Sequence, residues 1–168
     1  MKKLMMIAAL MLMSIGAFAQ EGKFAIGANA GFAAYGNEYN PIGVGAKLQY
    51  LFTENFRGEA AYNFWFPKTI HHFKSGLMDI DLNLQYLIPI SEGFNVYPLV
   101  GANLGMTHGD GDSESIFGFQ GGGGIEYYLS EQIKANFDVK YQYNKKTKDG
   151  IEMKYDGPVF QVGIAYVF

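Results

Sequence analysis

The sequence predicts an all-β protein, an eight-stranded antiparallel up-and-down transmembrane β-barrel. Three observations lead to this fold class. Beyond residue 19, apolar and polar residues alternate with a period of two, which is the side-chain period of a strand. Charged residues fall on one of the two faces that the alternation defines. The connections between alternating segments are short and long in turn, as in a barrel of consecutive hairpins.

The first 19 residues have the three-part pattern of a secretory signal peptide. Lysines at positions 2 and 3 precede an apolar run over 4–13, and a small-x-small motif ends at Ala19. A transmembrane anchor is the alternative, but this run is shorter than the roughly 20 residues that a spanning helix needs. We therefore expect 1–19 to be removed by cleavage between Ala19 and Gln20.

Residues 20–168 are expected to form one barrel domain. Aromatic residues make up 16% of the sequence and glycine accounts for 22 of 168 residues, which is unusual for a soluble globular protein. The net charge of −3 gives no basic surface for nucleic acid. Without cysteine, the chain has neither a disulfide framework nor a cysteine-linked lipid anchor.

Eight segments carry the alternation. The first alternates Phe, Ile and Ala with small residues, and the second alternates Ile, Val, Leu and Tyr with Gly, Lys and Gln. The third sets Phe, Tyr and Ala against Arg, Glu and Asn, and the fourth sets Ile, Leu and Met against Asp, Asn and Gln. The fifth is the least regular, the sixth contains four consecutive glycines, the seventh alternates strictly, and the eighth ends the chain. The segments are 24–32, 42–52, 56–66, 78–88, 94–106, 117–129, 133–144 and 159–168.

One face of these segments holds only apolar, aromatic and small residues. A soluble β-sandwich or lipocalin-like barrel would bury that face, whereas a membrane barrel turns it to lipid and keeps a polar interior. The signal peptide and the aromatic segment ends favour the membrane barrel. Because unpaired charges in a narrow interior are costly, we expect the inward charges to pair and fill the lumen. The expected network is Lys47, Arg57, Glu59, Asp79, Asp81, Glu126, Lys134, Asp138 and Lys140, with Lys23, Trp65 and Tyr97 on the same face.

The connections predict the orientation of the barrel. The short ones are 53–55, 91–93 and 130–132, and the long ones are 34–41, 67–75, 107–115 and 145–157. Outer-membrane barrels have short periplasmic turns and longer outward loops. We therefore expect the outer membrane of a Gram-negative cell, with both termini periplasmic and with lipid and lipopolysaccharide around the barrel.

The four consecutive glycines at 121–124 have three possible roles. A phosphate loop would require a following helix and a Lys-Ser or Lys-Thr pair, and a flexible linker would have polar flanks. Here an apolar and aromatic strand pattern continues on both sides. The glycines are therefore expected to let a strand bend or a bulky neighbour approach, with Gly121 and Gly123 facing lipid and Gly122 and Gly124 facing the lumen.

The last residues, QVGIAYVF, resemble the β-signal that the barrel-assembly machinery reads in outer-membrane proteins. The matching positions are Gln161, Gly163, Tyr166 and Phe168. With the eight-segment plan, the chain from Gln20 onward resembles the small eight-stranded outer-membrane barrels, the OmpA-transmembrane-domain and OmpX-like family. This resemblance implies insertion by that machinery, as a monomer. It implies no single activity, because members serve as anchors, adhesins, resistance factors and, in a minority, lipid-modifying enzymes.

Three further sequence features bear on strand regularity and on metal binding. Pro98 falls inside the fifth segment and predicts a bulge or local break, because it cannot donate to a ladder. Asp110, Asp112 and Glu114 alternate in a long connection, which suits either a solvated acidic loop or a hard cation such as Ca²⁺. The adjacent histidines at 71–72 point in opposite directions on an extended chain and suit one metal poorly.

The expected function is a structural or surface-interaction role through the outward loops, with no catalytic residues, cofactor or nucleic-acid partner. A small diffusion pore is one alternative, although eight strands leave an interior just filled by side chains. A lipid-modifying enzyme is another. It needs a Ser, a His and an acid within reach of one another, and the sequence shows no such local signature. The sequence does not identify an extracellular partner.

Overall fold

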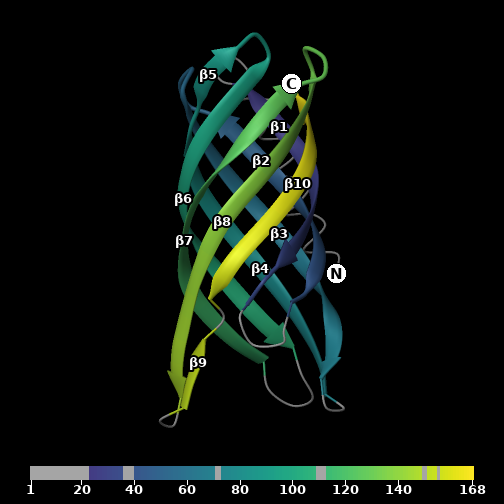
Figure 1. The fold of residues 1–168 in the computed structure, drawn as a ribbon, viewed down its shortest axis with the longest axis vertical. Coiled ribbons are helices and arrows are strands. Elements are labelled where there is room, and N and C mark those ends of the chain that lie inside the picture. Colours follow the sequence, from purple (N-terminus) through teal and green to yellow (C-terminus); the bar gives the residue numbers. More distant parts are fainter. Residues whose placement is uncertain (1–22, 36–39, 71–72, 109–112, 149–150, 155) are drawn as a thin grey trace, which may run out of the picture.

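The chain forms a closed antiparallel β-barrel (Figure 1). The computed structural model describes residues 23–35, 40–70, 73–108, 113–148, 151–154 and 156–168. Within these ranges there is no helix, and hence none long and apolar enough to cross a membrane. The strands are β1 (Phe24–Ala33), β2 (Ile42–Leu51), β3 (Phe56–Ile70), β4 (Phe73–Tyr86), β5 (Ile88–Ser91), β6 (Phe94–His108), β7 (Ser113–Tyr128), β8 (Ile133–Lys148), β9 (Ile151–Lys154) and β10 (Gly157–Val167).

Eight long strands close the barrel in the described part of the chain, which confirms the predicted fold class. Each pairs antiparallel with its neighbours, and β5 continues β4 along the side of β6. Closure comes from β1 and β10, whose register runs from Ala25 opposite Val167 to Ala33 opposite Val159. β10 also pairs with β8, and β9 forms a hairpin with the far end of β8.

The outer and inner faces of the barrel differ in polarity, as the period-two alternation of side chains predicts. Leu, Ile, Val, Phe and Tyr side chains cover the outside, and polar side chains fill the inside. Aromatic pairs stand on the outer face near both ends. Phe56 and Tyr86, with ring centroids 5.0 Å apart, lie near the short turns, and Phe117 and Phe119, 5.1 Å apart, lie near the opposite end. Two aromatic belts around an apolar band match the two interfaces of a membrane.

Three of the four predicted long connections, 67–75, 107–115 and 145–157, are largely strand, which corrects their prediction as loops, whereas 34–41 lies between the end of β1 and the start of β2. β3 continues to Ile70 and β4 begins at Phe73, and the β6–β7 and β8–β9 pairs extend in the same way. These extensions form the lower end of Figure 1, opposite the C-terminus. A register shift between Trp65 and Lys68 surrounds Pro67. Backbone pairing continues where the apolar alternation stops, so side-chain pattern alone ended the strands too early.

Pro98 interrupts pairing on one side of β6 only. Toward β7, Pro98 lies opposite Gly123 in a ladder that has no register shift. Toward β4 and β5, pairing stops at Gln85 and resumes at Ile88. The intervening Leu87 donates its N–H to the carbonyl of Asn55 at 2.7 Å. The predicted local break is therefore present, but the predicted bulge at the proline is absent.

The inner wall sets glycines beside bulky side chains. Gly124 lies between Tyr97 on β6 and Asp138 on β8, and the Tyr97 hydroxyl donates to Asp138 across it. A Cβ at Gly124 would meet the Tyr97 ring at 2.6 Å. A Cβ at Gly122 would lie 2.1 Å from a backbone oxygen of β8. The consecutive glycines thus continue β7 and allow close approach within the lumen.

The contrast between Gly122 and Gly121 gives a matched test. Gly122→Ala should lower the free energy of unfolding by about 1–3 kcal/mol, because its methyl group overlaps the backbone of β8. Gly121→Ala should be tolerated, since the nearest atom to its Cβ is the Leu99 carbonyl oxygen at 3.9 Å. Urea unfolding of both variants in detergent micelles measures the difference. Equal stability of the two variants would contradict the close approach of β7 and β8.

Candidate functional site in the barrel lumen

The most distinctive part of the molecule is its charged interior. The structure places all nine residues of the sequence-derived network inside the barrel, and none is more than 9% exposed. Trp65 and Tyr97 lie among them, at 1% and 2% exposure. The charged groups gather into three clusters, which we name after Arg57, Lys47 and Asp81.

The Arg57 cluster lies toward the short turns. Arg57 Nη1 donates to Glu126 Oε2 at 2.5 Å, and Lys134 Nζ lies 3.1 Å from the same oxygen. The other oxygen of Glu126 accepts a hydrogen bond from Asn95 at 3.0 Å. Arg57 Nε donates to Gln85 at 2.6 Å. One carboxylate therefore pairs with two cations, and the neutral amides of Asn95 and Gln85 bond Glu126 and Arg57.

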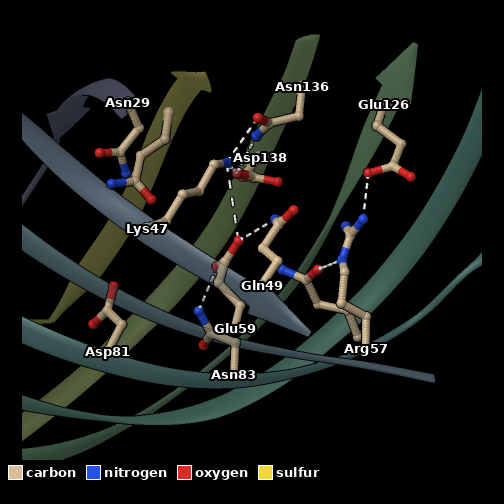
Figure 2. A network of polar contacts seen from close by, with 12 residues as sticks. Asn29, Lys47, Gln49, Arg57, Glu59, Asp81, Asn83, Glu126, Asn136 and Asp138 are labelled. Carbon is tan, nitrogen blue, oxygen red and sulfur yellow. Dashed lines mark hydrogen bonds and ion pairs between the residues drawn. The ribbon is translucent and has the colours of Figure 1, made fainter. Parts of the chain in front are cut away.

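The Lys47 cluster occupies the middle of the lumen (Figure 2). Lys47 Nζ donates to Asn136 at 2.7 Å and lies 3.9 Å from Glu59 and 3.8 Å from Asp138. Asn136 in turn donates to Asp138 at 2.7 Å. Gln49 donates to Glu59 at 2.7 Å. Here one cation lies between two carboxylates, the reverse of the Arg57 cluster.

The Asp81 cluster lies toward the extended hairpins. Lys140 forms an ion pair with Asp81. Asn63 donates to Asp79 at 2.6 Å and to Asp81 at 3.1 Å, and the Trp65 indole N–H donates to Asp79 at 2.8 Å. Asp81 thus pairs with the lysine, while Asp79 is held by neutral donors.

Uncharged amides connect the clusters, and sequence reasoning did not assign them this role. Asn83 donates to Glu59 at 3.1 Å and accepts from Gln120 at 2.5 Å. Gln142 donates to Gln120 at 3.1 Å and accepts from the Tyr35 hydroxyl. The alternation put Asn83 and Gln142 on the polar face, but only the stagger between strands shows which residues they bridge.

Apolar side chains pack together at both ends of the polar interior. Tyr35, Trp65, Leu77 and Val159 pack together at the hairpin end with Ala33. At the other end, Leu87, Tyr97 and Leu99 pack with Leu51, and Ala25, Ala165 and Val167 pack with Tyr128. The ionic clusters therefore lie between two apolar layers.

The remaining predicted residues fall elsewhere. Lys23 is exposed and precedes β1, and it lies at the rim of the lumen, where it lines a small cavity with Arg57 and Lys134. Of the β-signal residues, Gln161 points inward and donates to Asn63 at 3.0 Å, while Tyr166 and Phe168 are exposed with their rings 5.0 Å apart. A Cβ at Gly163 would meet Lys47 and Asn136.

Several predicted positions cannot be placed. Ala19, Gln20, Asp110, Asp112 and the histidines at 71–72 lie outside the described residues, and so does the side chain of Glu114. Among the described residues, no group of three or more His, Cys, Asp or Glu side chains is placed to hold a metal ion. The described lumen clusters consist of carboxylates, amides, basic and aromatic groups, which pair with one another.

A closed barrel with an apolar outside, aromatic belts and a polar inside defines a membrane-spanning β-barrel. The chain belongs to the outer membrane protein beta-barrel domain family, whose model matches residues 5–168. Fold and family together indicate the outer membrane of a Gram-negative cell. No protein with a curated description matches the chain significantly.

Solved structures share the fold at low sequence identity. Neisserial surface protein A is 12% identical, with a TM-score of 0.68 over 89% of this chain and 98% of that chain. OprG of Pseudomonas aeruginosa is 17% identical, with a TM-score of 0.65 over 88% and 96%. Ail, the attachment invasion locus protein of Yersinia pestis, is 17% identical, with a TM-score of 0.54 over 88% and 97%. The small outer-membrane barrel is thus the shared architecture.

Neutralising Glu126 should be strongly destabilising. Glu126→Gln keeps the shape of the side chain but leaves Arg57 and Lys134 buried without their carboxylate, so the free energy of unfolding should fall by about 3–5 kcal/mol. Glu131→Gln, the same change in an exposed turn, is the control and should leave stability unchanged. Urea titration in micelles measures both. A tolerated Glu126→Gln would show that the cluster contributes little to stability.

Proposed function

We propose that this protein is a closed, non-catalytic outer-membrane barrel that presents its extended hairpins at the cell surface for interaction. The observation that carries the proposal is the combination of nine lumen charges at 9% exposure or less with apolar layers at both ends. Opening a path would require breaking buried ion pairs, which costs several kcal/mol. A filled lumen leaves the ends of the barrel as its accessible surfaces.

The orientation follows from the unequal ends. Phe168 donates its N–H to the carbonyl of Phe24 at 2.8 Å at the end with the short turns, whereas the long hairpins extend from the other end (Figure 1). In outer-membrane barrels the short turns are periplasmic. On this basis both termini are periplasmic and the hairpins face outward. Residues 1–19 are removed on export, and the assembly machinery recognises the C-terminal strand.

The β8–β9 hairpin offers the clearest surface for a partner. It carries Lys145, Lys146, Lys148 and Lys154, with Glu152 as the acidic residue within its paired positions. Clustered lysines attract polyanions by a long-range electrostatic effect. Ail has been solved with the heparin analogue sucrose octasulfate, although its likeness to this chain is one of fold alone. We therefore propose that the partner is a polyanionic surface such as lipopolysaccharide. The alternative function is a small diffusion pore.

A closed lumen predicts that the protein conducts no ions. Purified protein in a planar bilayer should give no reproducible single-channel steps, because charged and apolar side chains fill the interior. Glu59→Lys should raise conductance or destabilise the barrel, since it places a second cation beside Lys47. A large porin inserted under the same conditions is the positive control. Steady channels from the unaltered protein would favour the pore.

Single cysteines can test the orientation, because the sequence contains none. Lys148→Cys, in the β8–β9 hairpin, should react with a membrane-impermeant maleimide on intact cells, whereas Glu131→Cys, in a short turn, should react only after lysis. A photocrosslinker attached to the Lys148→Cys variant should capture components of the cell surface. Separately, the intact mass of the exported protein tests whether the mature chain begins at Gln20. Labelling of Glu131→Cys on intact cells, or no adduct from Lys148→Cys, would overturn the proposal.

A further inference from the structure

A groove with a volume of about 730 Å³ runs across the outer face of the barrel. It crosses β1, β2, β3, β4, β6 and β7, from Phe24 to Phe119. Phe24 is the first residue of β1, whereas Phe119 lies well inside β7, away from the short turns. The groove therefore starts at the short-turn end and runs obliquely toward the hairpin end. Its volume is in the range of sites that bind small molecules.

Small residues form the floor of this groove and large apolar residues form its walls. Gly58 and Ala60 on β3 and Ala102 on β6 lie along the floor. The ring of Phe52 covers Gly58, since a Cβ at that position would meet the ring at 2.8 Å. The walls consist of exposed side chains from the neighbouring strands, namely Leu48, Leu82, Leu84, Val100 and Phe119.

The length and slope of the groove match a lipid acyl chain. Five spacings of about 4.8 Å between adjacent strands give a length of about 24 Å. Because the strands of such barrels tilt by roughly 35–45°, a groove perpendicular to them descends by about 15 Å. That depth is one leaflet of a hydrocarbon core about 30 Å thick. One flexible acyl chain can therefore follow the groove from the membrane interface to the bilayer midplane.

Close packing, rather than the hydrophobic effect, selects the occupant of this groove. The groove continues the apolar band of the barrel, and lipid tails are as apolar as its walls, so burial alone gives no gain. An unfilled groove, however, loses van der Waals contacts along its whole length. A flexible acyl chain can restore these contacts by following the floor, whereas a second copy of the barrel would need a matching oblique ridge.

The short-turn end of the groove adjoins two exposed charges of opposite sign. Lys23 directly precedes Phe24, and Glu54 follows Phe52 by two positions. The Leu51 N–H donates to the carbonyl of Lys23 at 2.9 Å, which joins the two segments. Lys23, Phe52 and Glu54 also line one open pocket at the barrel mouth. A cation and a carboxylate at the membrane interface complement a headgroup that carries both a phosphate and an amine.

We propose that the groove binds one acyl chain of a glycerophospholipid whose headgroup contains a phosphate and an amine. The phosphate lies near Lys23 and the ammonium group near Glu54, and the chain follows the floor from Gly58 to Ala102. The bound lipid is thus a component of the protein with a fixed stoichiometry. The choice of a phospholipid over lipopolysaccharide rests on the periplasmic position that we propose for the short turns.

Native mass spectrometry of the folded mature protein, released from detergent micelles, tests this site. Phosphatidylethanolamine should form a saturable adduct with one lipid per protein. Phosphatidylglycerol lacks the amine and should bind about threefold more weakly, the effect of one exposed ion pair. Equal affinity for the two phospholipids would overturn the headgroup assignment. Adducts that do not saturate, tighter binding of lipid A, or a protein dimer in place of the adduct would refute the proposal.

Variants on the outer face separate the groove from general lipid contact. Ala60→Phe fills the floor and should weaken phosphatidylethanolamine binding about tenfold, because the acyl chain loses its van der Waals contacts. Ala46→Phe is the matched control at an exposed outward position of β2 outside the groove, and should leave the affinity unchanged. Glu54→Gln, in an exposed turn, should abolish the preference over phosphatidylglycerol. If Ala46→Phe weakens binding as much as Ala60→Phe, the lipid contact is diffuse and the proposed site is wrong.

Discussion

The requirement that backbone polar groups be hydrogen-bonded within the protein governs this structure. Lipid offers no hydrogen bonds, and an unpaired backbone group in hydrocarbon costs several kcal/mol. The sheet therefore closes on itself through β1 and β10, and no long strand keeps an open edge within the apolar band. Even at Pro98, where the backbone hydrogen-bond ladder toward β4 is interrupted, the N–H of nearby Leu87 donates to the Asn55 carbonyl.

Closure with eight strands creates a second constraint, because the enclosed space is narrow. Several large side chains fit because an adjacent strand has a small residue. Tyr97 passes over Gly124 to reach Asp138, and the Trp65 ring lies against Gly43. The charged groups in the lumen must also pair with groups that come from other strands. Glu126 pairs with two cations while Lys47 lies between two carboxylates, and the amides of Asn83 and Asn136 donate to Glu59 and Asp138.

The function that we propose places interactions at the ends of the barrel. The middle is occupied by mutually paired groups between apolar layers. At one end, backbone pairing extends into hairpins, and the sequence of the β8–β9 pair contains four lysines. At the other, an open pocket of about 640 Å³ adjoins the cavity that Arg57 and Lys134 line. The closed lumen that we propose would suit recognition at a surface better than transport through the interior.

The sequence by itself determined the fold class, the number of long strands and which residues share a face. Each of these follows from a local period of two, as in the run from Ile133 to Asn144. It did not determine where the hairpins end, because backbone pairing beyond Pro67 continues without an apolar pattern. Nor did it reveal that Lys23 lies at the rim, since a face assignment does not fix where a strand begins. Only the tertiary structure decided that Lys47 meets Asp138 and that Arg57 meets Glu126, because those contacts depend on the stagger of strands far apart in the chain.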